Sequence, residues 1–261
     1  MAGAPCLAAR GAYRSGAGLV RVFVPESIWD IAAIKLDECT TAGLPETSSG
    51  TFKNLARIWT EEPAWCHAAV LGPGIGSGNA ATMAEVRRCA TLFPQALVLD
   101  ADGLNAFSDK RLSELGEARR KRKALRPLVL TPHPGEMARL LKISIERVQN
   151  DRQRAAIECQ KLTHGGVILL KGEGTIVTDG RRVYVNKTGN PGMATGGTGD
   201  VLSGMIAALI GQHMDAFDAA CLGAFLHGRA GDLTARRLGQ HSMMAGDLLQ
   251  ELPNAFLSYA K

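Results

Sequence analysis

Closely spaced cysteines are missing from this sequence. The six cysteines lie far apart along the chain, and no two of them form a C-x-x-C pair. They are Cys6, Cys39, Cys66, Cys89, Cys159 and Cys221. Structural zinc sites and the disulfide frameworks of small secreted proteins both depend on short, characteristic spacings. The sequence therefore argues against both kinds of site, and we expect reduced, mostly buried thiols.

Long apolar runs are missing as well. No stretch approaches the roughly 20 apolar residues that a transmembrane helix needs. The segment 1–5 lacks the charged region followed by an apolar region that marks a secretory signal. No internal similarity with a period of about 20 to 50 residues indicates a repeat array. We therefore predict a cytoplasmic enzyme with no membrane partner.

The chain has little excess charge of either sign. It contains 30 lysines and arginines against 25 aspartates and glutamates, a formal net charge of +5. This balance suits anionic small molecules and is too mild to indicate nucleic acid. The basic run 119–123 lacks the interleaved aromatic side chains that stack on bases in single-strand binders. We therefore predict a solvated surface for this run and no nucleic-acid partner.

A glycine-rich segment, residues 190–200, leads directly into residues 201–210, where apolar side chains recur at helical spacing. The start of a helix collects backbone N–H groups that have no intrahelical partner, and glycines let an anion approach the main chain closely. The segment therefore predicts a phosphate-binding site. It has neither the Gly-Lys-Ser/Thr of a Walker A loop nor the spacing of a dinucleotide-binding turn.

Asp200 closes this segment, although a carboxylate repels a phosphate group. One interpretation is a general base that removes the proton of a substrate hydroxyl. The other is a simple cap of the helix N-terminus. The residue pattern leaves both interpretations open and favours the base.

Short, wholly apolar runs alternate with helical stretches along the chain. The runs 68–71, 96–99 and 167–170, together with 128–131, which is apolar up to its final Thr131, are of the kind that is buried on both faces of a parallel sheet. The dipeptide Asp179-Gly180 between two further short runs predicts a β-hairpin. We therefore predict one α/β domain with a mainly parallel central sheet flanked by helices. A single helix is expected over 146–162, and residues 37–62 show no clear pattern.

Five loops at the predicted strand exits carry glycines or polar side chains. They are residues 72–76, 100–105, 131–136, 171–175 and 189–200. The carboxyl ends of parallel strands share one edge of a sheet, which is where open α/β sheets bind ligands. We therefore expect these loops to line one crevice that holds a nucleotide and a second substrate.

Individual polar residues in these loops have two interpretations each. Asp100, Asp102 and Asn105 suit the ordering of water, a metal ion or a hydroxyl, and equally the capping of the next helix. His133 stands between two prolines that hold it rigidly, in either a structural or a functional role. Lys171 follows an apolar strand and precedes a glycine, a position from which it could contact a phosphate.

Taken together, the loop sequences resemble the ADP/ATP-dependent NAD(P)H-hydrate dehydratases. The matching segments are Gly72-Pro73-Gly74-Ile75-Gly76, Asp100-Ala101-Asp102-Gly103-Leu104-Asn105, Thr131-Pro132-His133-Pro134-Gly135-Glu136, Lys171-Gly172 with Thr175, and Asn190-Pro191-Gly192-Met193-Ala194 with Gly196-Gly197-Thr198-Gly199-Asp200. The likeness runs in order from Met1 to about Leu252, and the combination is specific although no single segment is. It implies a ribokinase-like three-layer α/β fold with a β-hairpin, as a single domain over residues 1–261.

This resemblance implies the repair of hydrated NADH and NADPH. The hydroxyl of the hydrated nicotinamide ring is phosphorylated from ADP or ATP with Mg²⁺, and loss of phosphate restores NAD(P)H. The partners would be these small molecules, and a homo-oligomer, a tetramer, is expected. The forms His-Pro-Gly-Glu and Asn-Pro-Gly-Met-Ala resemble bacterial members, which favours ADP over ATP.

The resemblance also implies a role for particular residues. Asp200 would be the base, and the N–H groups of Gly197, Thr198 and Gly199 would surround the phosphoryl group in transfer. The hydrated dinucleotide would contact Ala4, Gly74, His133 and Asp200. The adenine nucleotide would contact Lys171, Gly172, Glu173, Gly174, Thr175 and Gly199. Glu136 would bind Mg²⁺ through water.

The beginning of the chain departs from the family pattern. Family members start with a strand and a Gly-Ser-rich turn ahead of a Gly-Met-x-Gly-Ala segment, whereas this sequence opens at Met1-Ala2-Gly3-Ala4. Met1 thus resembles an internal methionine, and the first strand of the fold is expected to be missing, as in a fragment or a chain whose start was placed late. Some relatives carry an epimerase domain before this one.

Two other functions stay open at this point. One is a small-alcohol or vitamin-precursor kinase of the same fold, which would share the aspartate of the glycine-rich loop. The other is a nucleotide-binding module without catalytic activity. The first predicts a stable phosphorylated product, and the second predicts binding of ADP without turnover.

Overall fold

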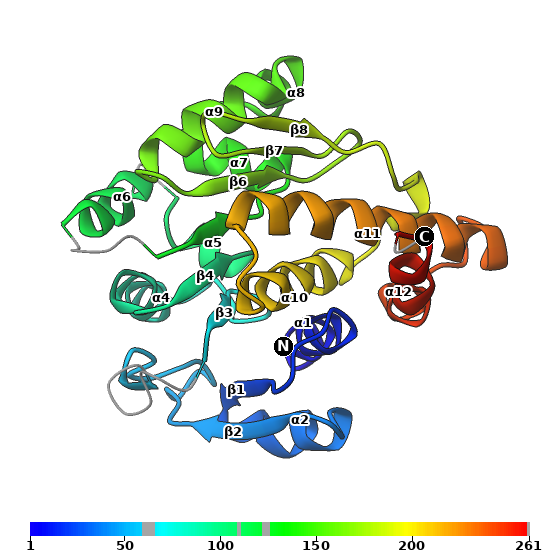
Figure 1. Cartoon of the computed structure of the whole chain (residues 1–261). Coiled ribbons are helices and arrows are strands. Elements are labelled where there is room, and N and C mark those ends of the chain that lie inside the picture. Colours follow the sequence, from blue (N-terminus) through cyan, green and yellow to red (C-terminus); the bar gives the residue numbers. More distant parts are fainter. Residues whose placement is uncertain (59–65, 109–110, 122–125, 260–261) are drawn as a thin grey trace.

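The main sheet has six strands in the order β3-β4-β5-β6-β7-β8 (Figure 1). The computed structural model describes residues 1–58, 66–108, 111–121 and 126–259. The strands are β3 (Ala68–Leu71), β4 (Ala96–Leu99), β5 (Leu128–Leu130), β6 (Val167–Leu170), β7 (Ile176–Thr178) and β8 (Val183–Val185). The first four run parallel, and β7 and β8 form an antiparallel hairpin. The predicted sheet and hairpin are both confirmed.

Helices cover both faces of this sheet, and the strand sequences explain why. Successive side chains of a strand point to opposite faces. On β6, Ile168 and Leu170 pack into one hydrophobic core, while Val167 and Leu169 pack into another. All of these side chains are apolar because both faces are covered. The predicted three-layer arrangement is confirmed.

Each layer of helices comes from a different part of the chain. The first layer contains α4 (Ala80–Leu92), α5 (Asp102–Asn105), α6 (Leu112–Arg120), α7 (Pro134–Leu141), α8 (Ile145–Asn150) and α9 (Arg152–Leu162). The second contains α10 (Thr198–Gly211) and α11 (Ala216–Leu238), against which α1 (Gly3–Arg14) and α12 (Ala245–Tyr259) pack. Within the described ranges, no helix combines the length and hydropathy of a membrane span.

A separate two-stranded parallel sheet lies at the opposite end of the molecule from β7 and β8 (Figure 1). It consists of β1 (Arg21–Pro25) and β2 (Thr40–Leu44), joined through the short helices η1 (Glu26–Ile28) and α2 (Trp29–Lys35). Val22 and Val24 pack with Ala32 of α2 in a small core of their own. Strand β2 falls in the region without a sequence assignment, because two threonines and a glycine weaken its apolar pattern.

The single helix expected over 146–162 is wrong. The structure divides it into α8 and α9 at Asp151, whose backbone is not helical. The Asp151 carboxylate accepts a hydrogen bond of 2.9 Å from the N–H of Arg154 and so caps α9. Aspartate side chains compete with the helical backbone for hydrogen bonds, which favours a break at this position.

The basic run 119–123 is not entirely on the surface. Arg119 is only 8% exposed, and its guanidinium donates a 2.9 Å hydrogen bond to the carbonyl of Arg126. The prediction of a solvated surface is therefore wrong for Arg119, since its position on α6 turns it toward the chain segment that enters β5. The last two residues of the run, 122–123, lie outside the described residues.

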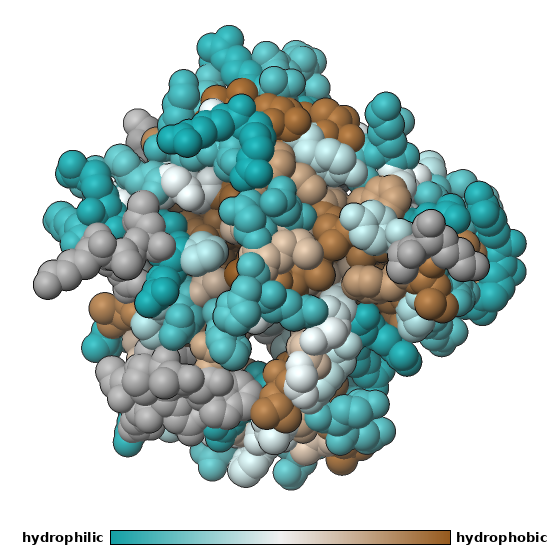
Figure 2. Space-filling model, in the orientation of Figure 1, coloured by the Kyte–Doolittle hydropathy of each residue, from teal (hydrophilic) through white to brown (hydrophobic). Residues whose placement is uncertain are grey.

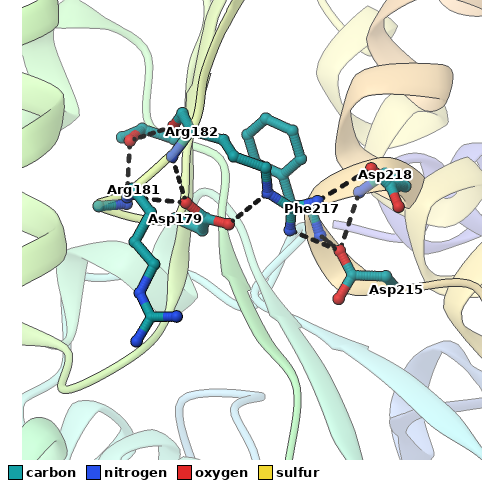
Figure 3. A network of polar contacts seen from close by, with 8 residues as sticks. Asp179, Arg181, Arg182, Asp215, Phe217 and Asp218 are labelled. Carbon is teal, nitrogen blue, oxygen red and sulfur yellow. Dashed lines mark hydrogen bonds and ion pairs between the residues drawn. The ribbon is translucent and has the colours of Figure 1, made fainter.

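An ionic network fastens the hairpin to α11 (Figure 3). Arg182 of the hairpin lies 2.7 Å from the Asp179 carboxylate and 3.0 Å from that of Asp215. Its guanidinium carbon stands 4.1 Å from the centre of the Phe217 ring. These contacts hold the antiparallel edge of the sheet against the start of α11.

The cysteines agree in part with expectation. All six are free. Cys6, Cys89 and Cys159 are buried, whereas Cys39, Cys66 and Cys221 are only partly buried. Half of the thiols therefore pack as small apolar side chains, and the expectation of general burial is too strong.

Candidate functional site

The glycine-rich segment ends in a turn that opens α10. Gly197 occupies the N-cap position with φ of 94°, a left-handed conformation that favours glycine. Val201 is the first residue whose N–H bonds back along the chain, to the Gly197 carbonyl at 3.2 Å. The N–H groups before it, of Thr198, Gly199 and Asp200, stand at the positive end of the helix dipole. The turn therefore offers a binding position for an anion.

Asp200 lies in the first turn of α10 and does not hold the cap position, which belongs to Gly197. The alternative that Asp200 only caps the helix is therefore wrong. Within the described ranges its carboxylate has no hydrogen-bond partner. Burial, reinforced by the Asp100 carboxylate, raises the pKa of Asp200 to about 6, although Lys171 acts in the opposite direction. The carboxylate is thus a stronger base than an ordinary aspartate and is still mostly ionised at neutral pH.

Lys171 lies between carboxylates that come from separate strand exits. Its ammonium nitrogen is 2.7 Å from Asp100 Oδ1 and 3.8 Å from Glu136 Oε2. A methyl group added at Gly199 would lie 3.2 Å from the same nitrogen, so the lysine also reaches the start of α10. Burial works against the ammonium form, but Asp100 and Glu136 outweigh it and raise the pKa of Lys171. The exits of β4, β5 and β6 therefore meet the start of α10 at one place, as the sequence predicts.

Two residues of α11 hold the glycine-rich segment in position. The Nε2 atom of His227 lies 2.9 Å from the carbonyl oxygen of Thr198. Because a carbonyl can only accept a hydrogen bond, Nε2 carries the proton. Burial lowers the pKa of His227 to about 4, which keeps the ring neutral. The Asp232 carboxylate accepts hydrogen bonds of 3.1 Å from Gly189 N–H and from the Asn190 side chain. No local signal in the sequence indicates either role, because the bonded residues lie 29 and 43 positions apart along the chain.

His133 and Glu136 form a capping box at the start of α7. His133 Nδ1 accepts from the N–H of Gly135 at 3.0 Å, and the Glu136 carboxylate accepts from the N–H of His133 at 2.8 Å. The His133 side chain is nevertheless 50% exposed. Its ring is therefore fixed in orientation and open to a ligand, so the structural and functional interpretations are compatible.

Asp102 connects two of the predicted loops. Its carboxylate accepts hydrogen bonds from the N–H of Gly76 at 2.8 Å and from the Asn105 side chain at 3.1 Å. Asn105 in turn accepts from Arg139 at 3.1 Å. Asp102 thus fixes the loop 72–76 against the exit of β4. The N-cap position of α5 belongs to Ala101, so Asp102 is not a simple cap, and the ordering of water, a metal ion or a hydroxyl by this segment stays a prediction.

Ala4 and Gly74 are neighbours across the start of α1. The carbonyl of Gly74 accepts a 2.7 Å hydrogen bond from the Met1 ammonium group. A methyl group added at Gly74 would lie 3.2 Å from the Ala4 side chain. Leu7, one turn further along α1, approaches Gly197 at the N-terminus of α10. The structure therefore joins these two predicted substrate residues to each other and places them on the same side as the glycine-rich turn.

The segment 171–175 makes a compact turn after β6. The Thr175 hydroxyl donates to the Gly172 carbonyl at 2.9 Å, and Gly172 and Gly174 have positive φ. Arg152 of α9 supports this turn by donating to the carbonyl of Lys171 at 3.3 Å. Sequence reasoning missed Arg152, because it lies in a separate helix with no motif around it.

The donor atoms of this cluster do not form a ready-made metal cage. In the part of the chain that the structure describes, no group of three or more His, Cys, Asp or Glu side chains is arranged to hold a metal ion. Glu136 is already bonded to the His133 N–H and lies near Lys171. The set therefore fits a cation that is bound mainly through nucleotide phosphates and water, which is how Mg²⁺ commonly binds.

The fold and the anion-binding turn define a class, the ribokinase-like α/β proteins. A solved ribokinase-like superfamily protein from Enterococcus faecalis aligns with a TM-score of 0.76 and 25% identity over 98% of this chain and 83% of its own. The predicted fold class is thereby confirmed.

Within that class the chain belongs to the NAD(P)H-hydrate dehydratase family, which matches residues 1–254. An ADP-dependent (S)-NAD(P)H-hydrate dehydratase from Neisseria meningitidis is 39% identical over 95% of this chain and 78% of the relative. The solved ADP/ATP-dependent NAD(P)H-hydrate dehydratase from Bacillus subtilis, co-crystallised with ATP/Mg²⁺, has a TM-score of 0.77 and 28% identity over 99% of this chain and 86% of its own. The family resemblance predicted from the sequence is therefore confirmed.

Other relatives are much longer. A bifunctional NAD(P)H-hydrate repair enzyme from Moorella thermoacetica is 44% identical over 97% of this chain, which covers 46% of that relative. The chain thus spans about half the length of this bifunctional relative.

Proposed function

We propose that this chain dehydrates hydrated NADH and NADPH at the expense of ADP. The observation that carries the proposal is the position of Asp200, a partly buried carboxylate with its pKa raised to about 6, in the first turn of the helix that opens with the glycine-rich turn. Family membership and the ADP-dependent relative support the choice of reaction and nucleotide.

Asp200 removes the proton from the hydroxyl of the hydrated ring, and the oxygen attacks the terminal phosphorus of the nucleotide. The N–H groups of Gly197, Thr198 and Gly199 stabilise the charge on the phosphoryl group in transfer. The bond from this phosphorus to the bridging oxygen of ADP breaks, so AMP leaves with the electron pair. The ring C–O bond then breaks with phosphate as the leaving group, and loss of a proton from the neighbouring ring carbon restores the double bond. The base and the anion-binding groups stand on one rigid helix start, so no loop has to move to bring them together.

The nucleotide and the dinucleotide approach this helix start from two directions. The turn 171–175 and Gly199 contact the adenine nucleotide, with Lys171 placed to offset phosphate charge. Ala4, Gly74 and His133 contact the hydrated dinucleotide from the side of α1 and α7. Glu136 would hold Mg²⁺ through water, and the bound ion would offset the charge of the nucleotide phosphates. A homotetramer in the cytoplasm remains a prediction, as does a single domain over 1–261.

The test is turnover by the purified chain with hydrated NADH, Mg²⁺ and ADP. We expect NADH absorbance to appear together with inorganic phosphate, and Asp200→Asn to reduce kcat by about 10²- to 10⁴-fold, the usual contribution of a general base. Glu251→Gln, which changes a carboxylate of α12 that pairs with Arg237, is the control. A stable phosphorylated dinucleotide would instead identify a kinase, and binding of ADP without any product would identify a module without activity.

A further inference from the structure

A buried polar side chain of α11 lies against the glycine-rich turn. Hydrophilic residues cover much of the face shown in Figure 2, so many polar side chains of this molecule meet water. His227 differs from them, because it is only 7% exposed and its neighbour Leu226 packs into a hydrophobic core. Buried polar side chains in native structures are nearly always hydrogen-bonded. The hydrogen bond that His227 makes therefore indicates what this side chain does.

His227 donates to the peptide unit that also carries the N–H of Gly199. Its Nε2 lies 2.9 Å from the carbonyl oxygen of Thr198. The carbonyl of one residue and the N–H of the next belong to the same planar amide and point in opposite directions. Among the described residues the N–H of Gly199 has no acceptor, since Val201 is the first residue of α10 to bond back along the chain. One amide thus joins a buried histidine to the anion-binding position.

The fold does not need this hydrogen bond to satisfy the carbonyl. Thr198 is the first residue of α10, and in an α-helix its carbonyl accepts from the N–H four residues later, that of Leu202. A carbonyl oxygen has two lone pairs, so it accepts from His227 as well. The second bond comes from a different helix and is additional to the hydrogen bonding of α10 itself. Its effect therefore falls on the amide.

A hydrogen bond to the carbonyl end of an amide strengthens the donor at the other end. The carbonyl oxygen draws electron density away from the nitrogen, which leaves the N–H more positive. Linked hydrogen bonds polarise one another in this way by roughly 10–30% per bond. The N–H of Gly199 is thereby a stronger donor to an anion than an ordinary N–H at a helix start. The gain matters most where negative charge develops in a site that excludes water.

The ring acts on the amide without adding a charge. Burial lowers the pKa of His227 to about 4, and the nearby Lys171 cation acts in the same direction. The ring is therefore neutral at physiological pH, with its proton on Nε2 facing the carbonyl. The positive charge of the cluster is left to Lys171, which lies 2.7 Å from Asp100. His227 thus orients a donor and does not bind an anion by its own charge.

We propose that His227 is a positioning residue for phosphoryl transfer, which orients and polarises the amide between Thr198 and Gly199 so that its N–H stabilises the group in transfer. The proposal rests on the proposed function, since it assigns a partner to the anion-binding turn of that reaction. His227 lies behind the turn and contacts neither substrate. The packing of α11 against α10 therefore sets the strength of a donor in the site.

The test compares two substitutions of His227 in the whole chain. His227→Gln keeps a donor, because the amide nitrogen of glutamine can take nearly the position of Nε2, whereas His227→Leu has none. We expect kcat to fall about tenfold in the Leu variant, less than the 10²- to 10³-fold that follows outright removal of such a donor. We expect kcat of the Gln variant, and KM for ADP and hydrated NADH in both variants, to stay within about threefold.

Thr234→Val is the matched control. Thr234 is fully buried on the same helix, and its hydroxyl donates a 2.9 Å hydrogen bond to the Ala230 carbonyl. Valine keeps the shape of the side chain and removes this bond, so we expect a lower Tm. We expect kcat to be unchanged, because the lost bond lies within α11. A loss of kcat that only follows loss of stability would appear in this variant too.

A second measurement does not depend on turnover. In the ¹⁵N-labelled chain, the amide resonance of Gly199 reports hydrogen bonding at the preceding carbonyl. We expect this resonance to move upfield in His227→Leu. It should stay near its original position in His227→Gln and in Thr234→Val.

Three results would overturn the proposal. They are an unchanged kcat in His227→Leu, an equal loss of kcat in the Gln and Leu variants, and a Gly199 resonance that does not respond to the loss of the donor. If His227→Leu does not fold, His227→Asn takes its place, because the shorter asparagine amide reaches only the position of Nδ1. If the unaltered chain shows no turnover, the proposed function fails, and the Gly199 resonance then decides by itself whether His227 polarises the amide.

Discussion

Asp200 carries its charge at a cost to folding. Burial and Asp100 raise its pKa from the ordinary 3.8 to about 6, so the folded chain holds the proton more tightly than the unfolded chain. Ionisation of Asp200 therefore lowers the free energy of unfolding, and this effect is fully present above pH 6. At a pH far below 4 the effect is absent. We expect Asp200→Asn to raise the free energy of unfolding by about 1–2 kcal/mol at pH 8, and to lose this gain as the pH falls below 4.

Urea unfolding at several pH values measures this effect. Asp30→Asn, at an exposed position on α2, is the control and should change the free energy of unfolding by less than about 0.5 kcal/mol. A destabilised Asp200→Asn at pH 8 would show that the carboxylate stabilises the fold, in conflict with its raised pKa.

Lys171 and Asp100 form a buried ion pair in which each charge stabilises the other. The Asp100 side chain is 2% exposed and lies 2.7 Å from the ammonium nitrogen. Lys171→Met leaves this carboxylate buried without its cation, so we expect a loss of about 3–5 kcal/mol in the free energy of unfolding. The double variant with Asp100→Asn should recover most of that loss. A double-mutant cycle by urea unfolding tests the coupling, and strictly additive losses would contradict it.

At the scale of elements, the contact between α1 and α10 sets the geometry of the site. A methyl group added at Gly204 would lie 1.9 Å from the Ala8 carbonyl oxygen, so only glycine allows this approach. We expect Gly204→Ala to move the helices apart and to cost about 1–3 kcal/mol of stability. Since α1 carries Ala4, the same variant should raise KM for the dinucleotide more than KM for ADP.

Gly246 of α12 provides a matched control, because a methyl group added there meets no atom within 4 Å. In a helix, alanine is favoured over glycine by up to about 1 kcal/mol, so Gly246→Ala should be neutral or stabilising. Thermal unfolding measures both variants. An equal Tm for the Gly204→Ala and Gly246→Ala variants would mean that α1 shifts to accept the methyl group without loss of stability.

The helices and strands themselves follow from local patterns to different degrees. Strand β6 is found because every residue of Val167–Leu170 is apolar, as burial on both faces requires. Strand β2 escapes detection because Thr40–Leu44 is only partly buried and has no alternation to read. The break at Asp151 escapes because a single capping aspartate is common inside a helical pattern on the surface.

At the scale of the whole molecule, the site exists only because separate strand exits converge. We expect saturating ADP with Mg²⁺ to raise Tm by about 5–10 °C at about 100 times Kd, and to slow hydrogen exchange in 171–175 and 197–199 together. The hairpin turn at Asp179 should be unaffected, as its contacts are with α11. Slower hydrogen exchange in only one of the segments 171–175 and 197–199 would show that they do not bind the same nucleotide.

The sequence by itself determined the class of fold, the family and the loops that carry the chemistry, because apolar runs, glycines and turn residues act through neighbours in the chain. Only the tertiary structure decided that Gly197 caps α10, that Lys171 bonds to Asp100, and that His227 and Asp232 hold the glycine-rich turn. Such contacts depend on how distant elements pack, and packing is set by the summed burial of the whole chain, which no local pattern records.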